Sequence, residues 1–170
     1  MSAFLEALAY TKREEGVYSD DPNDPGNWTG GRKGQGELRG TKYGISAKAY
    51  PHLDIKNLTL GEAREIYLND YWRPIKGDEL PRAWRISVFD TAVNVGVPRA
   101  VRMMQDALGV MVDGSIGPRT ISAAASADNR KLARFYARRA KWYTELDTFD
   151  GYWDGWFTRC FVMAMEAEEG

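Results

Sequence analysis

The sequence has very few of the side chains on which metal and thiol chemistry depends. Among its 170 residues there are one cysteine, Cys160, and one histidine, His52. A single cysteine excludes an intramolecular disulfide framework and suits synthesis in a reducing compartment. Histidine and cysteine together cannot supply three zinc ligands. We therefore expect no metal site and no other cofactor. Neither a Ser-His-Asp nor a Cys-His arrangement has local support.

Long apolar runs and an excess of one charge are also missing. No apolar stretch approaches the roughly 18 residues of a membrane span, so we expect no transmembrane segment. The formal net charge is -1, which argues against nucleic acid as a partner. Residues 1–16 lack a basic segment followed by an apolar one, and so do not resemble a signal peptide.

Apolar spacing predicts a mainly α fold. A helix over residues 2–14 would end near Gly16, which places Glu15 on its last turn. A Thr-x-x-Glu capping box at Thr59 predicts a helix that runs to about Tyr71. The sequence thus predicts a single helical domain in one or two lobes, with at most a short β element near residues 43–45. Further helices are expected at residues 46–50, 82–95, 98–108, 118–127, 129–146 and 152–167.

Residues 18–40 are rich in Gly, Pro, Asp and Asn and predict a long loop, a kind of segment that is usually functional or disordered. Asp24 lies in this loop, either as a catalytic carboxylate or as a turn residue that bonds the backbone two residues on. Thr41 follows the loop, and its hydroxyl can hold a water or begin a strand. A calcium loop is excluded, because Pro25 and Arg32 stand at the fifth and twelfth positions counted from Asp21.

Glu15 is the candidate general acid. A helix C-terminus is the negative end of the helix dipole, and neighbouring acidic residues add to the negative potential there. Both effects raise the pKa of a carboxyl group, as a general acid near neutral pH requires. Glycoside cleavage needs such an acid together with a second polar group that handles the water or the cation. Asp24 and Thr41 are candidates for that second role.

Three strings, taken together, resemble a known family. Their order is similar to the Glu-Asp-Thr arrangement of phage-type lysozymes, and in full to the signature of the glycoside hydrolase 108 family of N-acetylmuramidases. The strings are Glu15-Gly16-Val17-Tyr18, Asp21-Pro22-Asn23-Asp24-Pro25-Gly26 and Thr41-Lys42-Tyr43-Gly44-Ile45.

Later strings extend the resemblance. Residues 71–74 and 89–96 look like further blocks of that family, and residues 105–120 resemble the peptidoglycan-binding region that accompanies it. The resemblance implies a catalytic region over residues 1–95 and a peptidoglycan-binding-like helical region over 96–170, packed onto the same domain. Here Val17 replaces a family glycine. An insertion over residues 27–40 separates Asp24 from Thr41 and brings Glu37 as a rival carboxylate.

The resemblance implies a lysozyme that hydrolyses the β-1,4 bond between N-acetylmuramic acid and N-acetylglucosamine in bacterial peptidoglycan. Glu15 would protonate the glycosidic oxygen, and Asp24 with Thr41 would stabilise the cation or position the water. We expect a monomeric phage endolysin, held in the host cytoplasm until a holin opens the membrane, and then acting on the cell wall. A lytic transglycosylase and a non-catalytic peptidoglycan-binding module stay open as alternatives.

Four further residues are candidates for substrate binding. Tyr18 and Tyr43 flank the catalytic strings and can stack on sugar rings or pack in the core. Asp90 and Asn94 lie one turn apart on an apolar helix. They either form a structural network that ties this helix to the active-site loop or contact the acetamido groups of the substrate. The basic helix over residues 130–141 indicates a solvated face, or attraction to an anionic cell wall or membrane.

Overall fold

The computed structural model describes residues 2–11 and 18–168. The chain folds into two compact units. One unit combines Met1–Thr11 with Leu68–Gly170, and the other is Lys12–Tyr67. The second unit is therefore inserted into the sequence of the first, between its first helix and the remainder.

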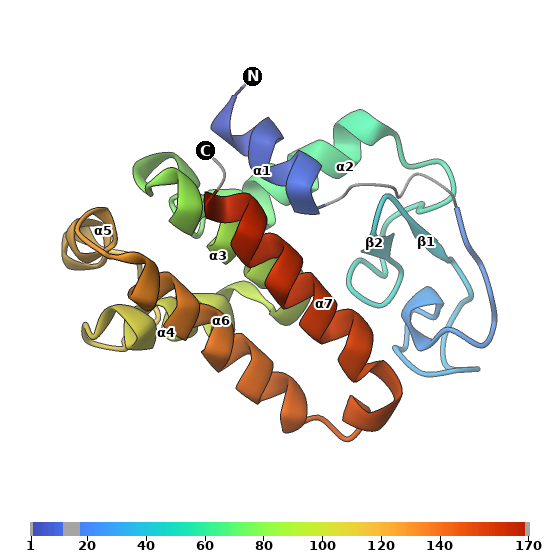
Figure 1. The fold of residues 1–170 in the computed structure, drawn as a ribbon. Helices are drawn as coiled ribbons and strands as arrows, with labels where there is room; N and C mark the ends of the chain where they lie inside the picture. The colour runs from blue at the N-terminus through green and yellow to red at the C-terminus, as the bar shows by residue number, and fades with distance from the viewer. Residues whose placement is uncertain (1, 12–17, 169–170) are drawn as a thin grey trace. The chain divides into compact units, whose positions relative to one another are not determined.

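The first unit is a bundle of helices around a central buried helix, α3 (Figure 1). Helices α1, α4, α6 and α7 all pack on α3, and α6 also packs along α7. Every residue of α3 from Ile86 to Ala92 is buried, so the helix is covered on all sides over about two turns, as a helix in the middle of a core is. The helices are α1 (Ala3–Thr11), α3 (Arg82–Val95), α4 (Val97–Leu108), α5 (Pro118–Ala125), α6 (Asn129–Thr144) and α7 (Phe149–Glu168), with short helices η2 (Leu68–Trp72) and η3 (Gly77–Glu79).

An aromatic cluster fixes α1 against α3. The rings of Phe4, Trp72 and Phe89 meet edge to face, with centroids 5.6 to 6.0 Å apart. Such pairs add stabilisation beyond that of the buried area. Because Phe4 is on α1 and Phe89 on α3, the cluster joins the first helix of the chain to the centre of this unit.

The second unit holds a small amount of β structure and one helix. Strands β1 (Thr41–Lys42) and β2 (Ile45–Ser46) pair antiparallel, with Thr41 opposite Ser46. The two residues between them, Tyr43 and Gly44, have φ angles of 53° and 72°, as a tight hairpin turn of type I′ requires. The unit also contains the short helix η1 (Pro25–Asn27) and helix α2 (Leu60–Tyr67).

The mainly α class predicted from the sequence is confirmed, and so is the helix over residues 82–95. The predicted capping box is present, because Thr59 and Glu62 each accept a hydrogen bond from the backbone N–H of the other. The predicted helix over residues 46–50 is wrong. Ser46 belongs to β2, and the N–H of Ala47 donates to the carbonyl of Gly40 at 2.9 Å.

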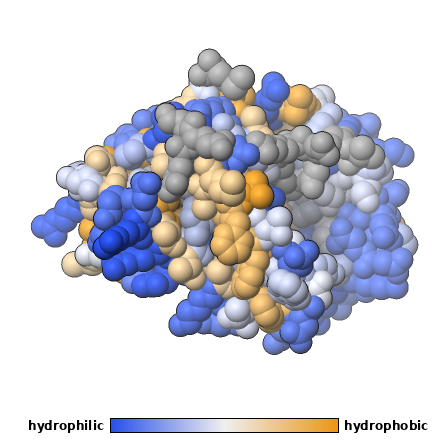
Figure 2. Space-filling view, viewed as in Figure 1, coloured by the Kyte–Doolittle hydropathy of each residue, from blue (hydrophilic) through white to orange (hydrophobic). Residues whose placement is uncertain are grey.

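Helix α7 carries apolar side chains both inward and outward. Cys160 and Met163 are buried, whereas Trp153, Phe161 and Met165 are exposed. Figure 2 shows apolar residues gathered on the face of the molecule that α7 occupies in Figure 1. Over residues 2–11 and 18–168, no helix has both the length and the apolar character that crossing a bilayer takes.

Candidate active site

Asp24 caps a short helix in the loop of the second unit. Its Oδ1 accepts a hydrogen bond from the N–H of Gly26 at 2.8 Å, and Pro25 begins η1 directly after it. This is the turn geometry that the sequence allowed. The other carboxylate oxygen, Oδ2, has no hydrogen-bond partner among the residues that the structure describes, and Asp24 is exposed. One oxygen thus fixes the side chain, while the other has no donor among the described residues.

The loop is organised around the buried side chain and carbonyl of Asn27, a residue that the sequence analysis missed. Its Oδ1 accepts a hydrogen bond from the hydroxyl of Thr41 at 2.7 Å, and its Nδ2 donates to the carbonyl of Asp21 at 3.0 Å. Its own carbonyl accepts from the N–H groups of Arg39 and Gly40. Asn27 therefore joins the two ends of the loop, three residues after Asp24.

The insertion over residues 27–40 does not separate Asp24 from Thr41 in space. Residues 28–38 fold back on themselves as a hairpin, in which Trp28 pairs with Leu38 and the N–H of Thr29 donates to the carbonyl of Glu37 at 2.9 Å. We call these residues the insertion hairpin. Glu37 itself is exposed and pairs with Arg39 at 2.6 Å, so its carboxylate already has a cationic partner.

Thr41 is held by its backbone as well as by its hydroxyl. Ser19 and Thr41 exchange two backbone hydrogen bonds, of 2.9 and 2.8 Å. Gly40, with a φ of +80°, lets these segments approach, because a Cβ there would lie 2.5 Å from the carbonyl of Ser19. Since the Thr41 hydroxyl donates to Asn27, its lone pairs remain available to accept a hydrogen bond from a water.

Tyr18 lines a hollow of about 390 Å3 together with Leu38, Arg39, Asp54 and neighbours. Its hydroxyl donates to the carbonyl of Arg39 at 3.4 Å. Burial, with smaller contributions from nearby carboxylates, raises the pKa of Tyr18, so the phenol stays protonated and remains a donor. The ring is half-buried and belongs to the same unit as Asp24 and Thr41.

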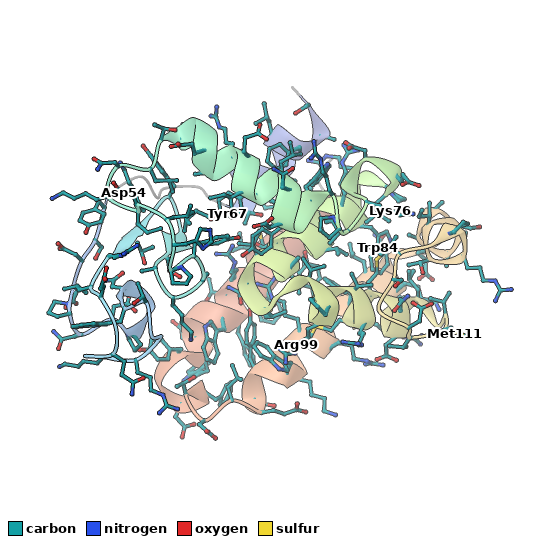
Figure 3. The ribbon with its side chains drawn as sticks, turned by 180° about the vertical axis from the view of Figure 1, so that it is seen from behind. Asp54, Tyr67, Lys76, Trp84, Arg99 and Met111 are labelled. Atoms are coloured by element: carbon teal, nitrogen blue, oxygen red, sulfur yellow. The ribbon has the colours of Figure 1, made fainter. Side chains whose placement is uncertain are left out.

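Tyr43 occupies the turn between β1 and β2. Its carbonyl accepts a hydrogen bond from the hydroxyl of Tyr67, the last residue of α2, which is labelled in Figure 3. The ammonium of Lys42 lies 5.4 Å from the centroid of the Tyr43 ring. The backbone and the ring of Tyr43 thus both have partners. The residue is half-buried and lies on the hairpin that carries Thr41.

Asp90 is completely buried in the first unit. Its two carboxylate oxygens accept hydrogen bonds from Arg139 of α6 at 2.6 Å and from Arg159 of α7 at 2.5 Å. Arg159 also donates to the carbonyl of Thr11 at the end of α1. This geometry favours a structural role, because no part of the carboxylate is exposed to a ligand. The network differs from the predicted one, however, since among the described residues it ties α3 to α1, α6 and α7 and not to the active-site loop.

Two neighbouring predictions change with this network. Arg139 was expected on a solvated basic face of residues 130–141; that expectation is wrong for Arg139, which is fully buried against Asp90. Asn94 is exposed, and its Oδ1 accepts a hydrogen bond from the hydroxyl of Tyr143 at 2.6 Å. Its contact with substrate stays a prediction.

Glu15 lies outside the residues that the structure describes. The role of Glu15 as the general acid therefore stays a prediction from the sequence. What the structure adds is the arrangement of Asp24, Asn27 and Thr41 in one hydrogen-bonded loop. Across residues 2–11 and 18–168, no three His, Cys, Asp or Glu side chains are grouped to hold a metal ion.

A helical bundle joined to a small unit of loops and one short hairpin is a mainly α, lysozyme-like fold. The chain belongs to the glycosyl hydrolase 108 family, whose family model matches residues 8–96. A second model, of a predicted peptidoglycan domain, matches residues 99–161. The protein is accordingly a glycosidase that acts on peptidoglycan.

A solved structure supports this assignment. SagA from Brucella abortus is similar to this chain with a TM-score of 0.80 and 31% sequence identity, over 96% of this chain and 92% of the SagA chain. No curated protein matches the sequence. The division into regions of residues 1–95 and 96–170 stays a prediction.

Proposed function

We propose that this protein is an N-acetylmuramidase that hydrolyses the β-1,4 bond between N-acetylmuramic acid and N-acetylglucosamine. Glu15 is the general acid that protonates the leaving oxygen. Asp24 stabilises the oxocarbenium-like state through its Oδ2, and Thr41 accepts a hydrogen bond from the attacking water. Tyr18 and Tyr43 contact the sugar rings on either side.

The observation that carries the proposal is the hydrogen bond of 2.7 Å between Thr41 and Asn27. It holds Thr41 beside the Asp24 turn although the insertion hairpin lies between them in the sequence. A hydroxyl whose proton is donated to a fixed acceptor, and whose lone pairs are free, is suited to orient a water. Together with an acid at Glu15, such a loop supplies the two functions that hydrolysis of a glycosidic bond needs.

The decisive experiment digests purified peptidoglycan with the wild type, with Glu15→Gln and with Glu14→Gln. New sugar ends are identified by mass spectrometry. We expect reducing N-acetylmuramic ends from the wild type, a loss of about 10²- to 10⁴-fold in Glu15→Gln, and a much smaller change in the matched control Glu14→Gln, which removes only a neighbouring charge. Full activity in Glu15→Gln would remove this residue from the mechanism.

The same digest separates the alternatives. Anhydro sugar ends would identify a lytic transglycosylase, which uses one acid and no water. A wild type that binds sacculi but releases no sugar would identify a non-catalytic binding module. NMR of the anomer that is released first then distinguishes inversion from retention of configuration.

We further propose that the protein acts as a phage endolysin. In this setting a monomer accumulates in the host cytoplasm and reaches the cell wall when a holin opens the membrane. The turbidity of cultures that express the protein with or without a holin tests this release to the cell wall. Lysis should occur only when the two are expressed together. Light scattering during gel filtration tests the monomer against its mass of 19.2 kDa.

A further inference from the structure

A groove lined by four cationic side chains and by the carboxylates of Asp106 and Glu145 lies between α4 and α6. It has a cavity volume of about 370 Å3, with Arg99 and Arg102 on the α4 side and Arg138 and Lys141 on the α6 side. A second hollow of about 380 Å3 shares Arg99 and Arg102 with the first, so the two adjoin. We call both together the α4–α6 groove. Figure 3 labels Arg99 on the side of α4 where α6 passes.

Only half of these cations are neutralised. Arg138 pairs with Asp106, and the Lys141 ammonium lies 3.9 Å from the Glu145 carboxylate. Arg99 and Arg102, in contrast, have no carboxylate partner in the part of the chain that the structure describes. They stand three residues apart on one face of α4, where like charges repel. A bound anion would relieve that repulsion.

The groove also offers apolar surface, and one of its cations is already oriented. The guanidinium of Arg99 lies 4.5 Å from the centroid of the Trp142 ring and donates to the carbonyl of Val95 at 3.2 Å. Stacking of this kind holds the planar donor group of arginine in place for a carboxylate. Met103 lines both hollows. The site therefore fits a ligand with carboxylates and small apolar groups.

The matching ligand is found on peptidoglycan itself. All the residues that line the first hollow fall within residues 99–161, the part of the chain matched by the predicted peptidoglycan domain. Where peptides are attached, the lactyl carboxyl groups of the glycan are consumed in amide bonds, and the negative charge resides on the stem peptides. We propose that the α4–α6 groove binds the free carboxylates of the stem peptide through Arg99 and Arg102. This inference rests on the proposed function for its choice of polymer.

The test measures binding of a soluble stem tetrapeptide, L-Ala-γ-D-Glu-meso-diaminopimelyl-D-Ala, by calorimetry. The proteins are the wild type, Arg99→Gln/Arg102→Gln, and the control Arg130→Gln/Arg134→Gln. The control removes the same charge from exposed positions of α6 outside the groove. We expect the groove variant to lose affinity about tenfold or more and the control to bind as the wild type does. A peptide with amidated carboxylates should bind weakly to all three.

Three results would overturn the proposal. The first is that the wild type does not bind the tetrapeptide. The second is an equal loss in both double variants, which would show a response to net charge alone. The third is groove-dependent binding of vesicles rich in phosphatidylglycerol without binding of the peptide, which would assign the site to a membrane surface. Unfolding midpoints of all three proteins show whether a loss of binding reflects a loss of folding.

The proposal can fail separately from the proposed function. If Glu15→Gln abolishes sugar release but still binds the tetrapeptide through Arg99 and Arg102, both stand. If the wild type releases reducing ends but does not bind the peptide, the muramidase stands and the groove assignment falls. If it binds the peptide and releases no sugar, the groove assignment stands and the muramidase falls.

Discussion

At the scale of single residues, the candidate active site depends on a buried amide more than on its exposed acids. Asn27 offers Oδ1 to Thr41 and Nδ2 to Asp21, so its side chain has both kinds of partner. A buried amide with satisfied donors and acceptors fixes its neighbours, because breaking one bond leaves another polar group without a partner. Thr41 is therefore oriented by a residue to which the proposed mechanism gives no other role.

Replacing the Thr41 hydroxyl should reduce activity, and it should also lower stability by about 1–3 kcal/mol, because the buried Oδ1 of Asn27 loses its donor. Thr41→Val keeps the shape but removes the bond to Asn27 and the acceptor for water. We expect sugar release to fall on the order of a hundredfold. Thr41→Ser keeps the hydroxyl and serves as the matched control, with activity near that of the wild type. Initial rates of reducing-end formation measure both, and an undiminished rate in Thr41→Val would exclude a role for the hydroxyl.

Glu6 gives a prediction for pH. A hydrogen bond from Arg82, at 2.7 Å, and a further one from Arg85 hold the pKa of Glu6 below its usual value of 4.5, although burial opposes this. The ionised form is thus favoured in the folded state. The contribution of ionised Glu6 to the stability of the fold is complete above pH 4.5 and is lost as the pH falls through the lowered pKa.

Urea unfolding at pH 6 and pH 3 measures this contribution. Glu6→Gln should be less stable than the wild type at pH 6, and the difference should narrow at pH 3. Glu65→Gln, an exposed change on α2, is the control and should differ little at either pH. A difference for Glu6→Gln that is the same at both pH values would mean that ionisation is not its source.

At the scale of elements, the insertion hairpin is a closed appendage on the loop. Its base is held by the Trp28–Leu38 pair, by the bond from Thr29 to Glu37 and by the carbonyl of Asn27. The indole N–H of Trp28 also donates to the carbonyl of Pro22 at 3.0 Å. The tip, residues 30–36, contacts the loop through the Lys33 ammonium, which donates to Oδ1 of Asn23 at 2.7 Å, but it makes no hydrogen bond to Asn27 or Thr41. Its length should therefore have little influence on the position of Thr41.

Shortening the tip should therefore preserve the enzyme. Replacing residues 30–36 by Asn-Gly joins Thr29 to Glu37 through a two-residue turn that suits their existing hydrogen bond. We expect sugar release within about twofold of the wild type. A deletion of residues 28–38 is the contrast and should lose activity, because it removes the base. Loss of activity in the short-tip variant with an unchanged unfolding midpoint would show that the tip contacts substrate.

The sequence predicts helices far better than it predicts which residues they bring together. Pro81 and Gly96 bracket α3, so local signals suffice for its ends. Residues 46–50 were misassigned because Ala47 bonds to Gly40, and no local pattern reveals such a contact. Asn27 follows Pro25-Gly26 and looks like an ordinary turn residue. The partners of Asp90 lie 49 and 69 residues away, on helices whose faces cannot be paired from sequence alone.

At the scale of the whole molecule, the two family models describe regions of sequence that share one core. Residues of the predicted peptidoglycan domain contact α3, which belongs to the first match. Phe135 packs edge to face on Trp84 at 5.8 Å, and the hydroxyl of Tyr136 donates to Ser87 at 2.8 Å. Arg139 has its only carboxylate partner among the described residues, Asp90, on α3. The boundary between the two family-model matches is therefore not a boundary between two separate hydrophobic cores.

We accordingly expect that residues 97–168 do not fold when expressed alone. The fragment would expose one side of α6 and leave Arg139 without its counter-ion, a change that typically costs about 3–5 kcal/mol. Circular dichroism should show helical signal without a cooperative thermal transition, while the full chain unfolds in one or more sharp steps. A sharp transition in the fragment, with near-ultraviolet signal from fixed aromatic rings, would contradict this.

The insertion of one unit into the sequence of the other has a consequence for synthesis. Helix α1 is synthesised before the helices that it packs against, because Glu6 bonds to Arg82, which lies 76 residues later, and Thr11 bonds to Arg159, which lies 148 residues later. Contacts of such long range form late, because the intervening chain must be ordered before they bring any gain. Unit Lys12–Tyr67 is complete long before that. On a ribosome stalled midway, the active-site loop would thus already be synthesised, whereas helix α1 would still lack the helices that it packs against.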